Sequence, residues 1–164
     1  MTSTAEGREA ASGSGRIPAS IRKEENQAVD QSIQNYGAEA AGDERASVIA
    51  AMRSFFGALA ASDYAQICTG LSSSNREQLQ QYRRLAEAGS GDCAAVLEKL
   101  FGSAAGAAEA RKAARATVSR VRVGDGSAFV LFRPAGGKLN YFVMQDEDGA
   151  WKATSISAGT PLVP

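Results

Sequence analysis

Apolar residues recur at two different spacings along this chain, and the change between them separates a helical part from a strand part. Between residues 43 and 102 they recur every three or four positions, as on one face of a helix. From Thr117 onward they alternate with polar residues, as in half-buried strands. The pattern predicts one α+β domain in which helices come first and antiparallel strands follow.

The strongest helical stripe lies in residues 43–61, which begin with Asp43, a residue type that caps helix N-termini. Its large apolar residues are expected to form the centre of the core: Val48, Met52, Phe55, Phe56 and Leu59. Three shorter helices are expected next. Their signals are Asp63 before a helix that ends at Gly70, the capping-box pair Ser74 and Glu77 before a helix that stops near Gly89, and Asp92 before a helix that ends at Gly102.

An alanine-rich stretch, residues 103–115, separates the helices from the strands. It permits helix but has no large side chain to bury, so we expect it to serve as a connection. Four β-rich runs follow, separated by turn-forming residues: 117–123, 127–133, 138–145 and 150–157. Three consecutive hairpins of this kind predict a four-stranded antiparallel meander.

Two details of the strands predict the shape of the sheet. Val118 is out of phase with Val121 and Val123. This phase break predicts a β-bulge near residue 119 or 120, and bulges give a sheet strong curvature. Residues 129–132 are all apolar, so the second strand is expected to be covered on both faces, by helices on one side and by a partner subunit on the other.

The start of the chain has a different composition from the rest. Residues 1–19 are mostly Gly, Ser, Ala and charged residues, with too little apolar surface to offset the entropy of ordering them, and we expect a flexible tether. Residues 20–42 are interpreted as a helical or partly ordered lead-in, because apolar residues recur at near-helical spacing as far as Tyr36. Residues 43–164 form the predicted domain.

Composition and charge exclude several classes of partner. The chain has 164 residues, 44% of them hydrophobic, and its 18 basic side chains balance 18 acidic ones. A neutral chain has no long-range field to attract nucleic acid, so none is expected as a partner. The longest apolar stretch falls well short of the roughly 20 residues of a membrane helix, so no membrane span is expected. Residues 1–20 contain no apolar core of a signal peptide, which leaves the compartment open.

Two cysteines, Cys68 and Cys93, permit one disulfide. Each falls on a short predicted helix beside a Gly/Ser loop, and a bridge is favoured over the alternative of two buried free thiols. It would close a loop of about 25 residues and stabilise the domain by about 3.5 kcal/mol. Because the chain has no histidine, two thiols would need carboxylate ligands to complete a zinc site, and neither a metal nor a cofactor is expected.

The order of these elements resembles the cone-shaped fold of the nuclear transport factor two-like superfamily, which includes SnoaL-like proteins. The residues that carry the resemblance are the helical run from Val48 to Cys68, the hairpin from Val121 to Ala128 and the sequence Asp-Gly-Ala-Trp-Lys at 148–152. The resemblance covers about residues 43 to 158. It implies that the helices pack into the concave face of a curved sheet.

More narrowly, the chain is similar to small extracytoplasmic lipoproteins of high-GC bacteria. In those proteins a helix ending in a small-small-Asp corner leads to a Cys-containing turn, a second Cys follows a Gly/Ser loop, and the last hairpin reads Glu-Asp-Gly-x-Trp-Lys. The matching positions here are Asp63, Cys68, Cys93 and residues 147–152. The chain carries neither their signal nor their lipidated cysteine, so an extracytoplasmic location is inferred from the cysteine pair, with the cytoplasm as the alternative.

Enzymes of this superfamily place acids, bases and a tyrosine inside the cone, which directs attention to Asp63 and Tyr64. A catalytic role for them competes with a simpler one, in which Asp63 caps a helix and Tyr64 packs in the core. The acidic run at residues 146–148 lacks the length of a calcium loop and is interpreted as a solvated turn. Aromatic and thioether side chains on neighbouring strands suggest a pocket or an interface. They are Tyr141, Phe142, Met144 and Trp151.

Three functional hypotheses follow from the sequence. The first is a non-enzymatic, extracytoplasmic domain that binds a small apolar molecule or a protein. The second is a small isomerase, hydratase or cyclase acting on an apolar ligand, which would need a buried carboxylate within hydrogen-bond reach of a tyrosine such as Tyr64, Tyr82 or Tyr141. The third is a structural module that forms a homodimer through the outer face of the sheet.

Overall fold

The computed structural model describes residues 33, 35–85, 92–102, 104–156 and 158. Within these residues it has a short strand, five helices and then four strands, which confirms an α+β fold with the main strands last. The predicted tether at residues 1–19 and nearly all of the predicted helix at residues 20–36 lie outside the described residues.

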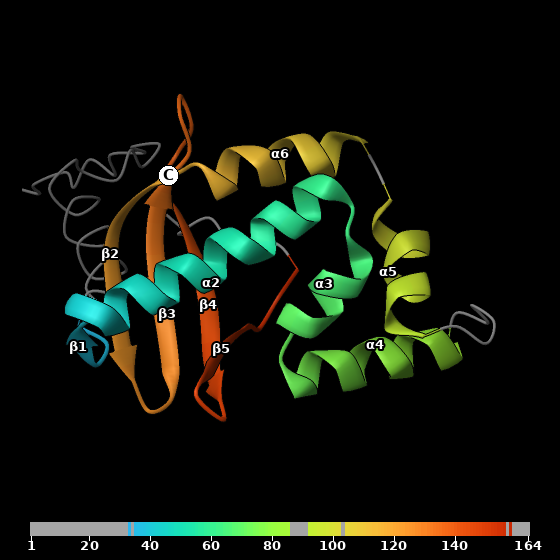
Figure 1. Ribbon diagram of the computed structural model, residues 1–164, viewed down its shortest axis with the longest axis horizontal. Helices are drawn as coiled ribbons and strands as arrows, with labels where there is room; N and C mark the ends of the chain where they lie inside the picture. Colours follow the sequence, from blue (N-terminus) through green and yellow to red (C-terminus); the bar gives the residue numbers. More distant parts are fainter. Residues whose placement is uncertain (1–32, 34, 86–91, 103, 157, 159–164) are drawn as a thin grey trace, which may run out of the picture.

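The five helices lie against one face of the sheet and beyond its edge (Figure 1). The longest, α2, crosses the sheet, α6 runs alongside it, and the other three helices, α3, α4 and α5, gather beyond its C-terminal end. Their bounds are α2 Gly42–Ala61, α3 Tyr64–Gly70, α4 Ser73–Leu85, α5 Cys93–Phe101 and α6 Ala104–Ala114.

Two of the expected helix caps are confirmed. The backbone N–H of Gln66 donates to Oδ1 of Asp63 at 3.1 Å, and the N–H of Ala95 donates to Oδ1 of Asp92 at 3.0 Å. The expected cap of α2 is wrong, because the N-cap position is Ala41, without a side-chain bond. Asp43 lies inside the first turn, where a carboxylate still favours the positive end of the helix dipole.

The N-terminus of α4 is stabilised by residues other than the predicted pair Ser74 and Glu77. Ser72 precedes the helix, and its Oγ accepts from the backbone N–H of Asn75 at 3.4 Å. Glu147, in the β4–β5 hairpin, accepts from the backbone N–H and the hydroxyl of Ser73 at 2.8 and 2.9 Å. A carboxylate from the far end of the chain therefore caps α4, which spacing along the sequence does not reveal.

The sheet is antiparallel, with its strands in the order β1-β2-β3-β4-β5. The bounds are β1 Ala38–Glu39, β2 Thr117–Gly124, β3 Ser127–Arg133, β4 Asn140–Glu147 and β5 Ala150–Ala153. The predicted count of four is one strand short, because β1 has only two residues and leaves no alternation to detect. The predicted bulge is confirmed by a register shift between Val118 and Arg120.

Strand β1 is fixed to the edge of β2 by side-chain contacts. Arg122 donates from Nε to the carbonyl of Tyr36 and from Nη2 to the carbonyl of Gly37, both at 2.9 Å. The backbone N–H of Val121 donates to Oε1 of Glu39 at 3.3 Å. Gly37 has a φ of +51°, and a Cβ there would lie 2.0 Å from the carbonyl oxygen of Val123, so this close approach requires glycine.

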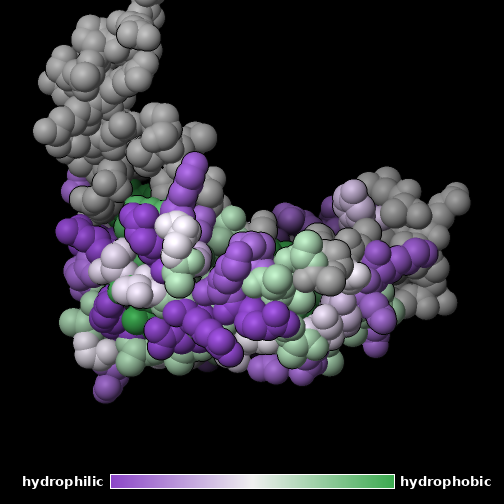
Figure 2. Space-filling view, turned by 90° about the horizontal axis from the view of Figure 1, so that it is seen from above, coloured by the Kyte–Doolittle hydropathy of each residue, from purple (hydrophilic) through white to green (hydrophobic). Residues whose placement is uncertain are grey.

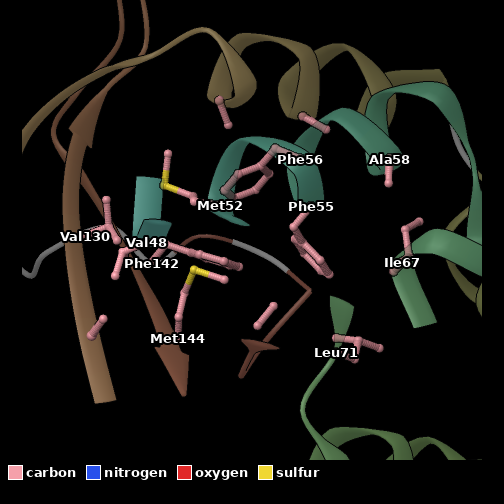
Figure 3. Close-up of a cluster of buried hydrophobic side chains, with 14 of the residues drawn as sticks. Val48, Met52, Phe55, Phe56, Ala58, Ile67, Leu71, Val130, Phe142 and Met144 are labelled. Carbon is pink, nitrogen blue, oxygen red and sulfur yellow. The ribbon is translucent and has the colours of Figure 1, made fainter. Parts of the chain in front are cut away.

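The core lies between α2 and the inner face of the sheet (Figure 3). Val48 and Met52 are fully buried against Phe142 and Met144 of β4. The inner face of β3 carries Ala128, Val130 and Phe132, and its other face carries Phe129 and Leu131. The helices cover the inner face of β3 as expected, and the partner subunit expected on the outer face stays a prediction. On the outer face the ring of Tyr36 packs on Phe129, with centroids 4.7 Å apart.

The alanine-rich stretch is more than the connection that was expected. It forms α6, which packs along much of α2 and buries Ala110 and Ala113 there. Helix–helix contact does not require large side chains, because alanines let two helix backbones approach closely. The size of these residues also determines the shape of the space beside α6.

Candidate functional site

A cavity of about 440 Å³ opens beside the C-terminal half of α2. Helices α3, α5 and α6 form its walls, and the ends of β3 and β4 close it on the sheet side. Most of the described lining is apolar. The apolar lining residues are Phe56, Leu59, Ile67, Leu97, Gly106, Ala107, Ala110, Ala113, Phe132, Pro134, Ile156 and Ala158.

The cavity exists because α6 supplies small side chains along its wall, apart from Glu109, which is exposed. Gly106, Ala107, Ala110 and Ala113 all line the space, and none of them extends beyond Cβ. On the opposite wall, Phe56 and Leu59 of α2 leave the volume between them and α6 unfilled. A hollow of this size with an apolar lining is of the kind that takes up small molecules.

Four polar residues complete the described lining: Ser62, Tyr64, Glu109 and Asn140. Tyr64 is half-buried, and its hydroxyl has no hydrogen-bond partner within the described part of the chain. The hydroxyl lies beside Gly102 at the end of α5, where an added Cβ would be 3.3 Å from it. Tyr64 therefore brings an unused donor and acceptor to an apolar space.

The other two larger polar groups of the lining have partners. Glu109 pairs with Lys112 at 2.9 Å on the exposed side of α6, and its side chain is 72% exposed, which places it at the mouth. The amide nitrogen of Asn140 donates to the carbonyl of Lys138 at 3.2 Å. Outside the mouth, on the side where α6 lies, hydrophilic side chains cover much of the surface (Figure 2). The apolar interior therefore contrasts with a polar surround.

The disulfide is formed between Cys68 of α3 and Cys93 of α5, with a Cα–Cα distance of 6.1 Å. It joins two helices that both contribute to the cavity wall. Ile67, next to Cys68, and Leu97, one helical turn after Cys93, line the space. The disulfide thus holds these two walls together.

The residues selected from the sequence are separated in space. Tyr64 lines the cavity, whereas Asp63 is exposed and is engaged in capping α3. Phe142 and Met144 are each 1% exposed and belong to the core. The other two residues of that group also lie outside the described lining: Tyr141 pairs with Leu131 on the outer face, and Trp151 packs against the core.

The sequence reading missed the residues that make the cavity. These alanines and one glycine form no recognisable motif. They contribute to the site because their short side chains leave part of the volume beside α2 unfilled. The available signal was the absence of large side chains from residues 103–115, which suggested a connection instead of one wall of a hollow.

The strongest electrostatic feature of the described residues lies away from the cavity. The backbone N–H of Ser73 donates to Glu147 and lowers the pKa of that carboxyl, helped by the Ser73 hydroxyl and by the charges of Arg76 and Lys152.

No cluster of three or more metal-ligating side chains occurs in the described residues. No helix in this part of the chain has the length and apolar character to cross a membrane.

Comparison with known proteins gives no relative: no protein-family model, no curated protein and no solved structure matches the chain.

Proposed function

We propose that this chain is a non-enzymatic, extracytoplasmic binding domain that holds one small apolar molecule in the cavity beside α2. The observation that carries the proposal is the hollow of about 440 Å³ lined mostly by apolar side chains. Binding of an apolar molecule in such a space is favourable, because apolar surface of both the molecule and the cavity is removed from water.

Binding is favoured over catalysis by the chemistry of the lining. The isomerase, hydratase or cyclase hypothesis needs a buried carboxylate near a tyrosine. Among the described lining residues, the carboxylate is that of Glu109, which is exposed and paired with Lys112. An exposed, ion-paired carboxylate is a poor general base for chemistry inside an apolar space.

The proposal includes membership of the nuclear transport factor two-like superfamily. It is supported by helices that cover one face of an antiparallel sheet and by a bulge in the first long strand of that sheet. The disulfide supports an extracytoplasmic location, since disulfides persist in oxidising compartments. Fractionation of cells that express the native gene tests the location, because a protein found only in the cytosolic fraction would contradict it.

Titration with Nile red, an uncharged apolar dye that fluoresces in apolar surroundings, tests the binding function. We expect saturable binding of one dye per chain. Ala107→Leu adds a larger side chain to the cavity wall and is expected to weaken the binding at least tenfold. Its matched control is Ala50→Leu, the same change at an exposed position of α2, which should bind like the unaltered chain.

A chain with an intact thermal transition but no saturable dye binding would contradict the proposal. So would equal dye affinity in the Ala107 and Ala50 variants, because the dye would then bind somewhere other than the cavity.

A further inference from the structure

We propose that the cavity selects uncharged lipids that carry a hydroxyl or carbonyl group, such as long-chain alcohols, and rejects fatty carboxylates. This inference rests on the proposed function, because it specifies the chemistry of the ligand for the same cavity.

The hydroxyl of Tyr64 is a polar group that a ligand in the cavity can bind. It is half-buried, lines the cavity and has no partner within the described residues. A phenol can donate one hydrogen bond and accept another, so it can bind either a hydroxyl or a carbonyl oxygen. A ligand with one such group satisfies Tyr64, whereas a pure hydrocarbon leaves it unpaired.

The charge around the cavity disfavours a carboxylate ligand. The described lining contains neither lysine nor arginine, so a carboxylate would find no cation there to pair with. Glu109 places a negative charge at the mouth, and the nearby Lys112 is already paired with it. A fatty acid would bring a second carboxylate toward this group, at the cost of both desolvation and like-charge repulsion.

The amide of Asn140, on the sheet side, is a second neutral group that a ligand can bind. Its nitrogen donates to Lys138, so its oxygen is the atom left to accept a hydrogen bond. With Tyr64 on the α3 side and Asn140 on the sheet side, two neutral groups on different walls can each bind a hydroxyl. Neither of them supplies the positive charge that a carboxylate needs.

The test uses 1-decanol and decanoate, which have the same chain length, as competitors of Nile red at pH 8. We expect the alcohol to bind at least about tenfold more tightly than the carboxylate. Tyr64→Phe should weaken decanol binding about three- to tenfold, the net value of one hydrogen bond. The matched control, Tyr141→Phe, removes a hydroxyl from the other face of the sheet and should leave decanol binding unchanged.

Glu109→Gln tests the charge argument separately. It removes the repulsion and frees Lys112, so the affinity for decanoate relative to that for decanol should rise several-fold. Equal or tighter binding of decanoate by the unaltered chain would overturn the selectivity and leave the binding function intact. A decanol affinity that Tyr64→Phe does not change would overturn the role of the hydroxyl. If neither compound nor Nile red binds, the proposed function itself fails.

Discussion

The two halves of helix α2 face very different surroundings. Val48, in the N-terminal half, and Met52, at the midpoint, are fully buried against Phe142 and Met144. In the C-terminal half, Leu59 faces a cavity of about 440 Å³. Both halves carry large apolar side chains, so the difference lies in the opposing surface: the sheet offers aromatic and thioether groups, whereas α6 offers alanines. An apolar stripe on a helix predicts that the helix is buried. Whether the volume beside the stripe is filled depends on the size of the side chains on the element that packs against it.

Phe142→Ala should produce the largest loss of stability. The residue is 1% exposed and the centroid of its ring lies 4.7 Å from that of Phe56, so removing the ring leaves a new cavity in the core between α2 and the sheet. We expect the free energy of unfolding to fall by about 3–5 kcal/mol. Leu59→Ala, at the wall of the existing hollow, should cost about 1–2 kcal/mol. Urea denaturation measures both, and equal losses would mean that the sheet side and the cavity side of α2 are packed alike.

Removing the disulfide is expected to have the next largest effect. Cys68→Ser combined with Cys93→Ser should lower the free energy of unfolding by about 3.5 kcal/mol, because the unfolded chain regains the freedom of a loop with a sequence separation of 25. Nile red binding should also weaken, since α3 and α5 are then joined only by noncovalent contacts. A double variant with unchanged stability and unchanged dye affinity would show that neither wall depends on the bridge.

Adding volume should distinguish the two halves most directly. Ala128→Leu places a larger side chain on the fully packed inner face of β3 and should cost about 1–3 kcal/mol. Ala107→Leu makes the same change at a half-buried position beside the hollow and should stabilise the chain by about 0.5–1 kcal/mol while reducing dye binding. Thermal unfolding and dye titration of both variants provide the measurement. A strongly destabilised Ala107 variant would mean that α6 has no room on that side.

The smallest effect concerns the cap of α4 by Glu147. A carboxyl whose pKa is lowered in the folded state adds stability above its ordinary pKa of about 4.5 and loses that contribution as the pH falls through the lowered value. Glu147→Gln should therefore lower the Tm slightly at pH 7, and the two Tm values should converge in acid. Asp125→Asn changes an acid in the other hairpin and is the control. A Tm difference that persists at low pH would rule out the charged cap.

Local signals in the sequence predicted the features that depend on a few neighbouring residues. Asp63 and Asp92 cap helices because the N–H that each one binds lies three positions later. The bulge beside Val118 was visible as a break in alternation. Contacts between distant segments were not visible: Glu147 reaches Ser73 only after the sheet has formed, and the alanines of α6 become a cavity wall only once α2 lies opposite.

The contacts along the edge of β2 that only the two-residue strand β1 covers affect how molecules of this protein behave toward one another. An eight-residue strand at the side of a sheet offers its backbone groups to any other chain in solution. Here Glu39 accepts from the N–H of Val121, Ala40 donates to the Val121 carbonyl, and Arg45 reaches the carbonyl of Val118. Because these groups are already occupied, a second strand has little to pair with, and edge-to-edge aggregation through β2 is disfavoured even at high protein concentration.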